Sequence, residues 1–480
     1  MRLIARPGVA VAVLAAVVGC AVGPRYVRPP IAEPDAYKET AGWKIAEPQA
    51  DVARGPWWEI FGDPTLSALE EQVDVSNQNI AVAEAQFRDA AALVREARAG
   101  YFPTVAIGVG VVRSRNALGP SVGSGTTNDF SLPINASWEP DLWGRIRRTV
   151  ESARETAQAS AADLEGARLS ARASLAQDYF LLRAQDAQEQ LLTATVHDYE
   201  KALQLTRNQY EAGVVSRADV LQAETQLETT RAQAVDVGVQ RAQLEHAIAL
   251  LVGRPASTFS LPPAPLTAAP PVVSAGVPSA LLERRPDVAA AERRVAAANA
   301  QIGVAVAAYF PSVTLSAEGG FQSTNAARWL VWPMRFWSVG ATVSETVYDA
   351  GLRRARTDEA RAVYEASAAT YRQTVLAAFQ AVEDNLAALR ILEEEARVQD
   401  GAVEFAQQSV TVLTNQYKAG TVSYLNVITA QTTALTNERV AIGILGSRMS
   451  DTVLLIEALG GGWNAADLPS ATAATARDVR

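Results

Sequence analysis

The stretch of sequence that decides the fold is NQYEAGVVS at residues 208–216, because it returns almost unchanged as NQYKAGTVS at residues 415–423. The two copies are 207 residues apart, and the motif YFP recurs at 101–103 and 309–311 with an offset of 208. Two pairs of glycines keep this spacing, namely Gly144 with Gly351 and Gly253 with Gly460. Four pairs in one register indicate that a unit of about two hundred residues is duplicated.

Each unit is predicted to hold the same elements in the same order: a helix, two strands, a long helix and a shorter helix. In the first unit we expect them at residues 64–100, 102–113, 128–138, 145–211 and 217–252. In the second unit we expect them near 279–308, 310–322, 336–348, 352–418 and 424–459. The predicted fold class is therefore mainly α with a small β part.

The duplication also predicts how the chain is divided. The predicted segments are a signal peptide at 1–19, an N-terminal segment at 20–63, a first repeat at 64–278, a second repeat at 279–463 and a tail at 464–480. A Pro-rich stretch at 262–278 lies at the boundary between the repeats. We expect this stretch to cross an equatorial belt around the helices.

The long helix of each unit sets the dimensions of the molecule. The helix at 145–211 has 67 residues and would extend for about 100 Å. The two shorter helices of the unit would cover nearly the same length if they were stacked end to end. Small and apolar residues recur along the long helix at alternating spacings of four and three, which indicates coiled-coil packing. These residues are Ile146, Val150, Ala153, Ala157, Leu164, Ala167 and Ala171.

The predicted strands are amphipathic. Val313, Leu315 and Ala317 alternate with polar residues, and tryptophans such as Trp138 and Trp337 lie near the strand ends. This pattern is typical of a transmembrane barrel strand with one face toward lipid and the other toward water, although a half-buried soluble sheet shows the same alternation. Four strands cannot close a barrel without unpaired edges in lipid, so a barrel requires several chains.

The N-terminus carries an export signal. Arg2 and Arg6 precede an apolar run at 9–18 that is too short to span a bilayer and has the length of a signal-peptide core. Cys20 follows directly and is the only cysteine of the chain, so it cannot form an intrachain disulfide. The segment VVGC at 17–20 resembles a bacterial lipobox, which implies a covalent lipid on Cys20. Ala21 after the cysteine points, by the same resemblance, to the outer membrane.

Several function classes are disfavoured by composition and motifs. The formal net charge of −9 argues against a nucleic-acid partner, and the acids are more consistent with solvated helix faces than with a cation-tolerant lumen. His197 and His246 have no ligands at metal-binding spacing, so we expect no metal and no cofactor apart from the lipid. The chain contains no nucleophile elbow and no phosphate-binding loop, so we expect that it is not an enzyme.

The duplicated plan, the Tyr-x-Ala-Gly turns and the lipobox together resemble the TolC-type outer-membrane factors of tripartite efflux pumps, in their lipoprotein (OprM/NodT-like) branch. The segments at 55–64 and 282–287 share this resemblance, which covers nearly the whole mature chain. It implies a homotrimer with a long α-helical coiled-coil tunnel in the periplasm and a transmembrane β-barrel of twelve strands shared among protomers. It also implies contact with outer-membrane lipid, a periplasmic adaptor protein and an inner-membrane transporter.

The resemblance places a gate at the periplasmic tip, where Gly213 and Gly420 mark the two helix-hairpin turns. The family's inter-coil tie corresponds to Tyr417 and Asp219, and we expect the gate to depend on this pair, with Arg217 as a further candidate. Two structural explanations stay open beside the gate. Tyr417 also fits a heptad position, and Asp219 also fits a first-turn acid that faces a helix dipole.

Other charges of the family's gate are absent here. The family arginine corresponds to Val422, and the two positions of the family's aspartate rings correspond to Asn426 and Thr429. Rings of acids in a narrow pore select cations. We therefore expect a weaker cation preference at this constriction.

The predicted function is the outer-membrane exit duct of an efflux system, which passively conducts drugs or other small toxic compounds to the cell exterior. Two alternatives remain: a duct for type I polypeptide secretion, and a non-conducting coiled-coil lipoprotein spacer. Only a channel needs amphipathic strand pairs in each repeat, which disfavours the spacer.

Overall fold

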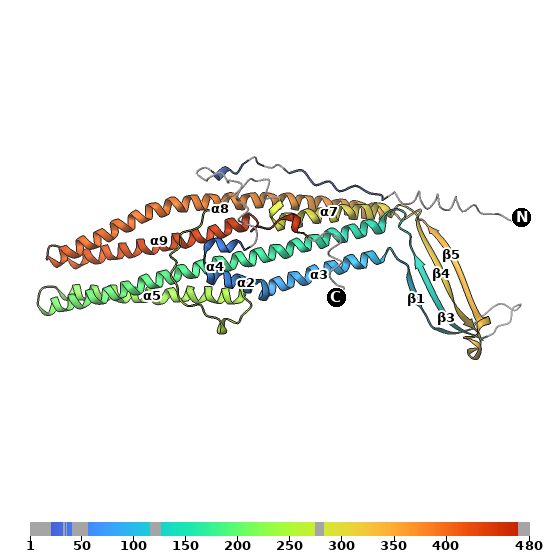
Figure 1. Cartoon of the computed structure of the whole chain (residues 1–480), viewed down its shortest axis with the longest axis horizontal. Helices are drawn as coiled ribbons and strands as arrows, with labels where there is room; N and C mark the ends of the chain where they lie inside the picture. The colour runs from blue at the N-terminus through green and yellow to red at the C-terminus, as the bar shows by residue number, and fades with distance from the viewer. Residues whose placement is uncertain are drawn as a thin grey trace.

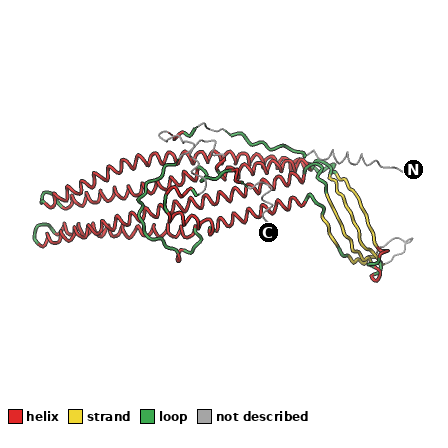
Figure 2. Tube along the Cα trace, viewed as in Figure 1, coloured by secondary structure: helices red, strands yellow, loops and turns green. Residues whose placement is uncertain are grey.

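The computed structural model describes residues 21–31, 34, 36–40, 56–115, 126–273 and 283–468. The helices lie together in one elongated body, and a single inclined sheet extends from one end of it (Figures 1 and 2). The predicted signal peptide, Cys20 and the last twelve residues, 469–480, lie outside the described residues.

Two long helices run the length of the body, as predicted. Helix α4 (Arg145–Glu211) and helix α8 (Leu352–Lys418) have 67 residues each. At the end far from the sheet, each turns back into a 35-residue partner, α5 (Arg217–Leu251) or α9 (Tyr424–Ala458) (Figure 1). Across the described ranges, none of the helices combines the length and the apolar character that crossing a membrane requires.

The half of the body near the sheet holds the other shorter helices, α2 (Pro64–Ser76), α3 (Gln78–Ala99) and α7 (Pro286–Ala307). The prediction of one continuous helix at 64–100 was wrong, because the helix breaks at Asn77. The Asn77 side chain accepts hydrogen bonds from the N–H groups of Asn79 (2.9 Å) and Ile80 (3.2 Å) and so begins a new helix. In the second repeat, α7 begins at Pro286, after a break at Arg285 that follows two helical residues at 283–284. The predicted start near residue 279 lies outside the described residues.

The shorter helices meet end to end through equivalent hydrogen bonds in the two repeats. The Asn77 side chain donates to the carbonyl oxygen of Leu251 at 2.8 Å. Arg285, 208 residues later, donates to the carbonyl oxygen of Ala458 at 2.9 Å. Each donor precedes the first residue of α3 or α7, and each acceptor lies at the end of α5 or α9. The predicted stacking of short helices along each long helix is therefore confirmed.

Glycine is required at both of these joints. Gly253 has φ of +66° and Gly460 has φ of +92°, which are left-handed conformations. A Cβ atom at Gly253 would collide with the carbonyl oxygen of Ser76, and one at Gly460 would collide with that of Arg284. The repeated glycines identified in the sequence thus mark close contacts between consecutive short helices.

The predicted heptad seam of α4 is buried. Ile146, Val150 and Ala157 are 5%, 1% and 3% exposed. Ala157 packs against Ala90 and Val94 of α3. The small residues of the seam allow α3 to approach this part of α4 closely.

The Pro-rich segment is tied to the middle of the body by a buried ion network. Asp186 of α4 pairs with Arg183 at 2.9 Å and with Arg241 of α5 at 2.7 Å. The same two arginines donate to the carbonyl oxygens of Pro262 and Leu261, both at 2.8 Å. These bonds hold the described start of this segment across α4 and α5.

The sheet contains β1 (Thr104–Ile107), β2 (Gly110–Arg115), β3 (Thr126–Trp138), β4 (Ser312–Ser323) and β5 (Arg335–Ser344). All pairs are antiparallel, with β1 and β2 both on β3, followed by β4 and β5. Both β1 and β2 pair with β3 in one register, from Thr104 opposite Ser137 to Gly110 opposite Ser131. They therefore form one interrupted strand, and the predicted pair of strands in each repeat is confirmed.

The predicted extension of the last strand to residue 348 was wrong, because β5 ends at Ser344. Beyond it the chain turns toward α8. The carboxylate of Asp349 accepts hydrogen bonds from the N–H groups of Gly351 (3.0 Å) and Arg353 (3.1 Å). Since Asp349 holds the start of α8, the residues just before it leave the sheet.

A buried carboxyl group lies in the hydrophobic core at the middle of the body. Glu70 of α2 is fully buried next to the core residues Leu69 and Val73, and neither of its carboxyl oxygens accepts a hydrogen bond within the described residues. Burial raises its pKa to about 9, although the positive charge of Arg172 acts in the opposite direction. Glu70 is therefore protonated at neutral pH.

The buried Glu70 makes stability depend on pH. Since its folded-state pKa lies above the unfolded value of 4.5, the folded state binds more protons between these values, and the free energy of unfolding falls as pH rises. At about pH 8, we expect the free energy of unfolding of Glu70→Gln to exceed that of the wild type by more than about 1 kcal/mol. Above about pH 5, this free energy should fall less steeply with pH in the variant than in the wild type. Denaturant unfolding followed by helical circular dichroism measures this change. The control is Glu71→Gln, at the exposed neighbouring residue, and its free energy of unfolding should depend on pH as in the wild type. Equal pH dependence in the wild type and both variants would contradict the prediction.

Candidate functional site

The two hairpin turns lie at the same end of the body, opposite the sheet (Figure 1). Gly213 has φ of +73° and Gly420 has φ of +75°. The residue after each glycine donates its N–H to the carbonyl five residues earlier, at 2.8 Å in the first turn and 3.0 Å in the second. A Cβ at either glycine would meet no atom within 4 Å, so the backbone conformation alone favours glycine there.

Side chains from all four helices pack together near these turns in what we term the tip cluster. Its buried members are Tyr199, Leu203, Ala223, Leu227, Tyr424 and Val427, and its half-buried members include Leu413 and Tyr417. The cluster joins the α4/α5 hairpin to the α8/α9 hairpin. Any change in the separation of the two hairpins must therefore repack it.

Tyr417 makes a polar connection across the tip cluster. Its hydroxyl donates to Oε1 of Gln209 on α4 at 2.7 Å, and its ring lies 5.2 Å from that of Tyr424. Burial raises the pKa of Tyr417, and the nearby negative charge of Asp219 raises it further. Tyr417 thus links α8 to the other hairpin and also occupies the heptad position predicted for it.

Asp219 takes part in capping the N-terminus of α5. Its carboxylate accepts from the N–H of Ser216 at 2.9 Å and from the Ser216 hydroxyl at 2.7 Å, while the Ser216 oxygen accepts the N–H of Asp219 at 3.3 Å. This is a capping box. The hydroxyl of Tyr417 bonds to Gln209 in this chain, so Asp219 acts on Tyr417 through its charge.

The second hairpin has a different start. Asn426 stands where the first repeat has Asp219, and its amide lies 3.5 Å from the hydroxyl of Ser423. Thr429 bonds to its own helix, at 2.9 Å from the carbonyl oxygen of Leu425. Asn426 and Thr429 are exposed on α9, as Arg217 is at the start of α5.

The strand registers divide the sheet into two faces, because successive side chains of a strand point to opposite sides. The apolar face holds Val105, Ile107, Val109, Val111, Ile134, Ala136, Trp138, Leu315, Ala317, Trp337, Val339 and Ala341. Several of these are strongly exposed, including Val105 at 67% and Trp337 at 79%. The opposite face is polar and places Glu318 between Asn135 and Ser338.

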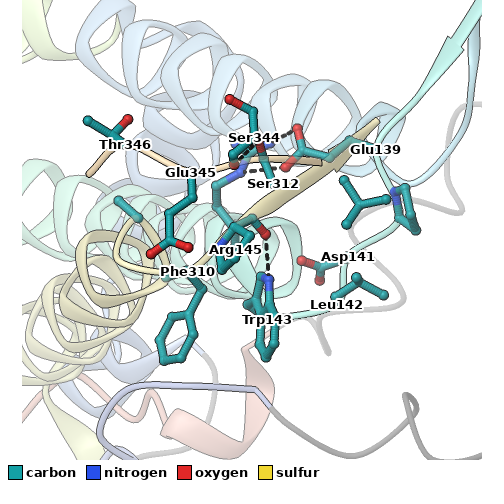
Figure 3. A pocket seen from close by; sticks show the side chains of 15 residues that line it. Glu139, Asp141, Leu142, Trp143, Arg145, Phe310, Ser312, Ser344, Glu345 and Thr346 are labelled. Atoms are coloured by element: carbon teal, nitrogen blue, oxygen red, sulfur yellow. Dashed lines mark hydrogen bonds and ion pairs between the residues drawn. The ribbon is translucent and has the colours of Figure 1, made fainter. Parts of the chain in front are cut away.

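A cavity of about 170 Å³ lies where the sheet joins the helices (Figure 3). On its wall, the Glu139 carboxylate pairs with Arg145 at 2.8 Å. Trp143 donates its indole N–H to the carbonyl oxygen of Pro311 at 2.7 Å and stacks on Phe310 at 4.9 Å. These contacts brace the sheet against α4 and α7. In the described part of the chain, no three His, Cys, Asp or Glu side chains are grouped to hold a metal ion.

A helical body with hairpins at one end and a two-faced sheet at the other is the architecture of an outer-membrane channel. The solved structure of the outer-membrane channel OprN covers 92% of this chain and all of its own, with 31% identity and a TM-score of 0.87. The chain belongs to the outer membrane efflux protein family, whose model matches residues 69–254 and 277–461. The starts of these two segments are 208 residues apart and their ends 207, the same offsets as in the repeated motifs.

Two curated relatives have efflux or export in their names. The toluene efflux pump outer membrane protein TtgC of Pseudomonas putida is 32% identical over 455 residues, which is 93% of each chain. The pyoverdine export outer membrane protein OpmQ of Pseudomonas aeruginosa is 31% identical over 416 residues, covering 85% of this chain and 87% of the relative. Both matches extend through the helical body and the sheet.

Gln209 was not predicted from the sequence as the partner of Tyr417. Its only signal was membership of the repeated motif, where Gln209 and Gln416 are equivalent. The contact itself depends on how the two hairpins pack, which the repeat does not specify.

We expect the tie between Tyr417 and Gln209 to favour the closed tip. Tyr417→Phe removes the hydroxyl but keeps the ring, so it should shift the open-to-closed ratio by about fivefold, which corresponds to about 1 kcal/mol. Asp219→Ala should add to the effect by loosening the start of α5. Single-channel conductance in planar bilayers measures both variants. The matched control is Tyr210→Phe, at the equivalent exposed tyrosine of the first hairpin; if neither variant opens the channel beyond this control, the gate assignment fails.

Proposed function

We propose that this protein is the exit duct of a tripartite efflux system, and that it conducts drugs or other small toxic compounds passively to the cell exterior. The observation that carries this proposal is the joining of a body built on 67-residue helices to a sheet with one strongly exposed apolar face. Membership of the efflux family and the two relatives named for efflux and export support it. The role is one of conduction, and we assign no catalytic step to it.

We propose a homotrimer as the functional form. In the described sheet, the β1/β2 strand lies at one edge and β5 at the other. Lipid cannot satisfy the free backbone groups of these edges, so they must pair with strands of other chains. Three copies of the four strand positions would close a barrel of twelve strands, with the polar faces inside. The helices would then form a tunnel in the periplasm.

We propose that Cys20 carries lipid and anchors the chain in the outer membrane. Ala21, which follows it in the sequence, packs against Gly144 at the start of α4. The N–H of Val22 donates to the carbonyl oxygen of Trp143 at 3.1 Å. The beginning of the mature chain is therefore held at the junction of helices and sheet, where acyl chains would reach the membrane. This supports a division into a signal peptide at 1–19, an N-terminal segment at 20–63, repeats at 64–278 and 279–463, and a tail from 464.

We propose that the hairpin tips receive a periplasmic adaptor protein, which connects the duct to an inner-membrane transporter. The tips lie at the far end of the body from the sheet, so they point into the periplasm when the sheet is in the outer membrane (Figure 1). The Tyr417–Gln209 contact and the tip cluster, together with Asp219 and Arg217, form the gate that such an adaptor would open.

We propose that this gate has a weaker cation preference than a gate that carries both rings of acids. Asn426 and Thr429 provide amide and hydroxyl groups where acids would form an electronegative ring. From Phe405 to Asn437, along both arms of the second hairpin, the only charged residue is Lys418. The second hairpin thus offers almost no fixed charge to a passing ion.

Restoring acids should restore cation preference. We expect Asn426→Asp combined with Thr429→Asp to shift the reversal potential under a salt gradient toward that of the cation, because the trimer would then present two rings of negative charge. The control adds two acids to the first hairpin, through Gln204→Glu combined with Asn208→Asp. This control should shift the reversal potential much less. A wild-type channel that is already strongly cation selective would overturn the proposal.

The efflux function is tested in cells that lack the gene. We expect the deletion to increase susceptibility to dyes, detergents and antibiotics, and the wild-type gene to restore tolerance. A gene with Ala317→Pro should not restore it, because β4 pairs on both sides and loses a ladder hydrogen bond; Ala317→Val is the matched control. Unchanged tolerance in the deletion would rule out drug efflux. Loss of a secreted polypeptide in the deletion strain would indicate a duct for type I polypeptide secretion. Absence of conductance in bilayers would indicate a non-conducting coiled-coil spacer.

A further inference from the structure

The apolar face of the sheet becomes basic at the end far from the helices. In the β1/β2 strand, the side chains on this face are Val105, Ile107, Val109 and Val111, and the next two are Arg113 and Arg115. The strand register confirms that these two arginines lie on the apolar face. Arg113 lies opposite Asn128 and Arg115 lies opposite Thr126. Both partners are on the apolar face of β3, because they alternate with the residues of its polar face.

The other edge of the sheet shows the same change at this end. Arg335 lies opposite Phe321 on the apolar face, two residues before Trp337. Its guanidinium carbon is 3.7 Å from the centre of the Trp332 ring. Arg328 is exposed in the loop between β4 and β5, in the short helix η6 (Ala326–Arg328). The four exposed arginines, which we term the rim arginines, are Arg113, Arg115, Arg328 and Arg335.

No acid balances the rim arginines. The sequence contains no Asp or Glu from 110 to 128 or from 319 to 344. The nearest acid along β3 is Asp129, which points to the polar face and accepts from the amide of Gln322 at 3.1 Å. Among the ion pairs of the described residues, none involves a rim arginine. The positive charge is therefore free to attract an external anion.

The rim arginines lie at the height where an apolar band ends. The eight residue steps from Val105 to Arg113 extend for about 26 Å along the strand. The lipid-facing band of a transmembrane barrel is about 25 Å tall and is flanked by aromatic residues, and a lipid-facing arginine costs little near its border. The rim is distal to the helices, so it faces the outer leaflet when the tips are in the periplasm (Figure 1). Arginine is suited to this border because its planar guanidinium forms paired hydrogen bonds with phosphate.

We propose that the rim arginines and Trp332 form a binding site for the phosphate groups of phosphorylated glycolipid in the outer leaflet. The proposal rests on the barrel insertion proposed above. Arg113, Arg115 and Arg335 project from the lipid-facing side, so their partner is a membrane lipid and not a solute inside the duct. Trp332 holds Arg335 by stacking, which leaves its N–H groups available to the phosphate oxygens.

The test measures binding of diphosphorylated lipid A to the delipidated, full-length protein in detergent by native mass spectrometry. We expect replacement of all four rim arginines by glutamine to weaken lipid A binding at least about tenfold, because each substitution removes a charge-assisted contact to phosphate. Lysine at the four positions should retain part of the affinity, because it keeps the charge without the paired hydrogen bonds. Lipid A without its phosphates should bind the wild type and the glutamine variant equally, and inorganic phosphate in excess should compete only weakly.

The matched control replaces four exposed arginines of the helical body by glutamine. They are Arg207, Arg231, Arg390 and Arg397, all in ion pairs with glutamates. This control should bind lipid A as the wild type does. Equal loss in the control, or equal binding of lipid A with and without phosphates by the wild type, would overturn the proposal. If the fourfold variant fails to fold, Arg115→Gln alone should still weaken binding severalfold, and no change there would also overturn it.

Channel conductance separates this proposal from the function on which it rests. A wild-type protein that conducts in planar bilayers but does not discriminate lipid phosphates refutes the lipid site and leaves the duct intact. A protein that neither inserts nor conducts refutes the duct itself.

Discussion

Each 67-residue helix has a buried seam that neighbouring helices must cover, and the rest of the molecule depends on this constraint. No second helix of the same length is available within a repeat. Two shorter helices cover the seam instead, and they meet at a joint in the middle. Asn77 and Arg285 fasten these joints to the ends of α5 and α9, and glycines at 253 and 460 allow the backbones to touch. The uniform height of the helical body follows from this arrangement.

The sheet is governed by a different constraint. An isolated sheet with one apolar face and two free edges is unstable in water and incomplete in lipid. Both problems are removed if several copies close a barrel, because the apolar face then points outward to lipid and no strand edge stays unpaired. The stacked Trp143 and Phe310 and the Glu139–Arg145 pair then hold each sheet at its inclination to the helices. The helical body and the sheet are thus coupled through a small junction beside Ala21 and Val22.

The two repeats differ in charge at the hairpin tips. In the first hairpin, Asp219 forms a capping box with Ser216. In the second, Asn426 takes its place and its side chain makes only a long contact of 3.5 Å to the Ser423 hydroxyl, without a capping box. Tyr417 of the second hairpin instead reaches across to Gln209 of the first. The duplicated fold therefore carries an asymmetric tip, in which one hairpin is charged and capped and the other is nearly neutral.

Much of the fold was determined by the sequence alone, because its signals are periodic and local. The repeat offset, the heptad spacing and the alternation in the strands predicted the long helices to the residue, as well as four strand positions and their apolar face. The break at Asn77 had a local signal in its capping side chain, but that signal competed with an otherwise continuous helical pattern. Only the tertiary structure decided which groups far apart in the chain meet. The bond from Tyr417 to Gln209, the burial of Glu70 and the basic rim of the sheet depend on helix packing and strand register, which bring together residues whose separation in sequence carries no signal.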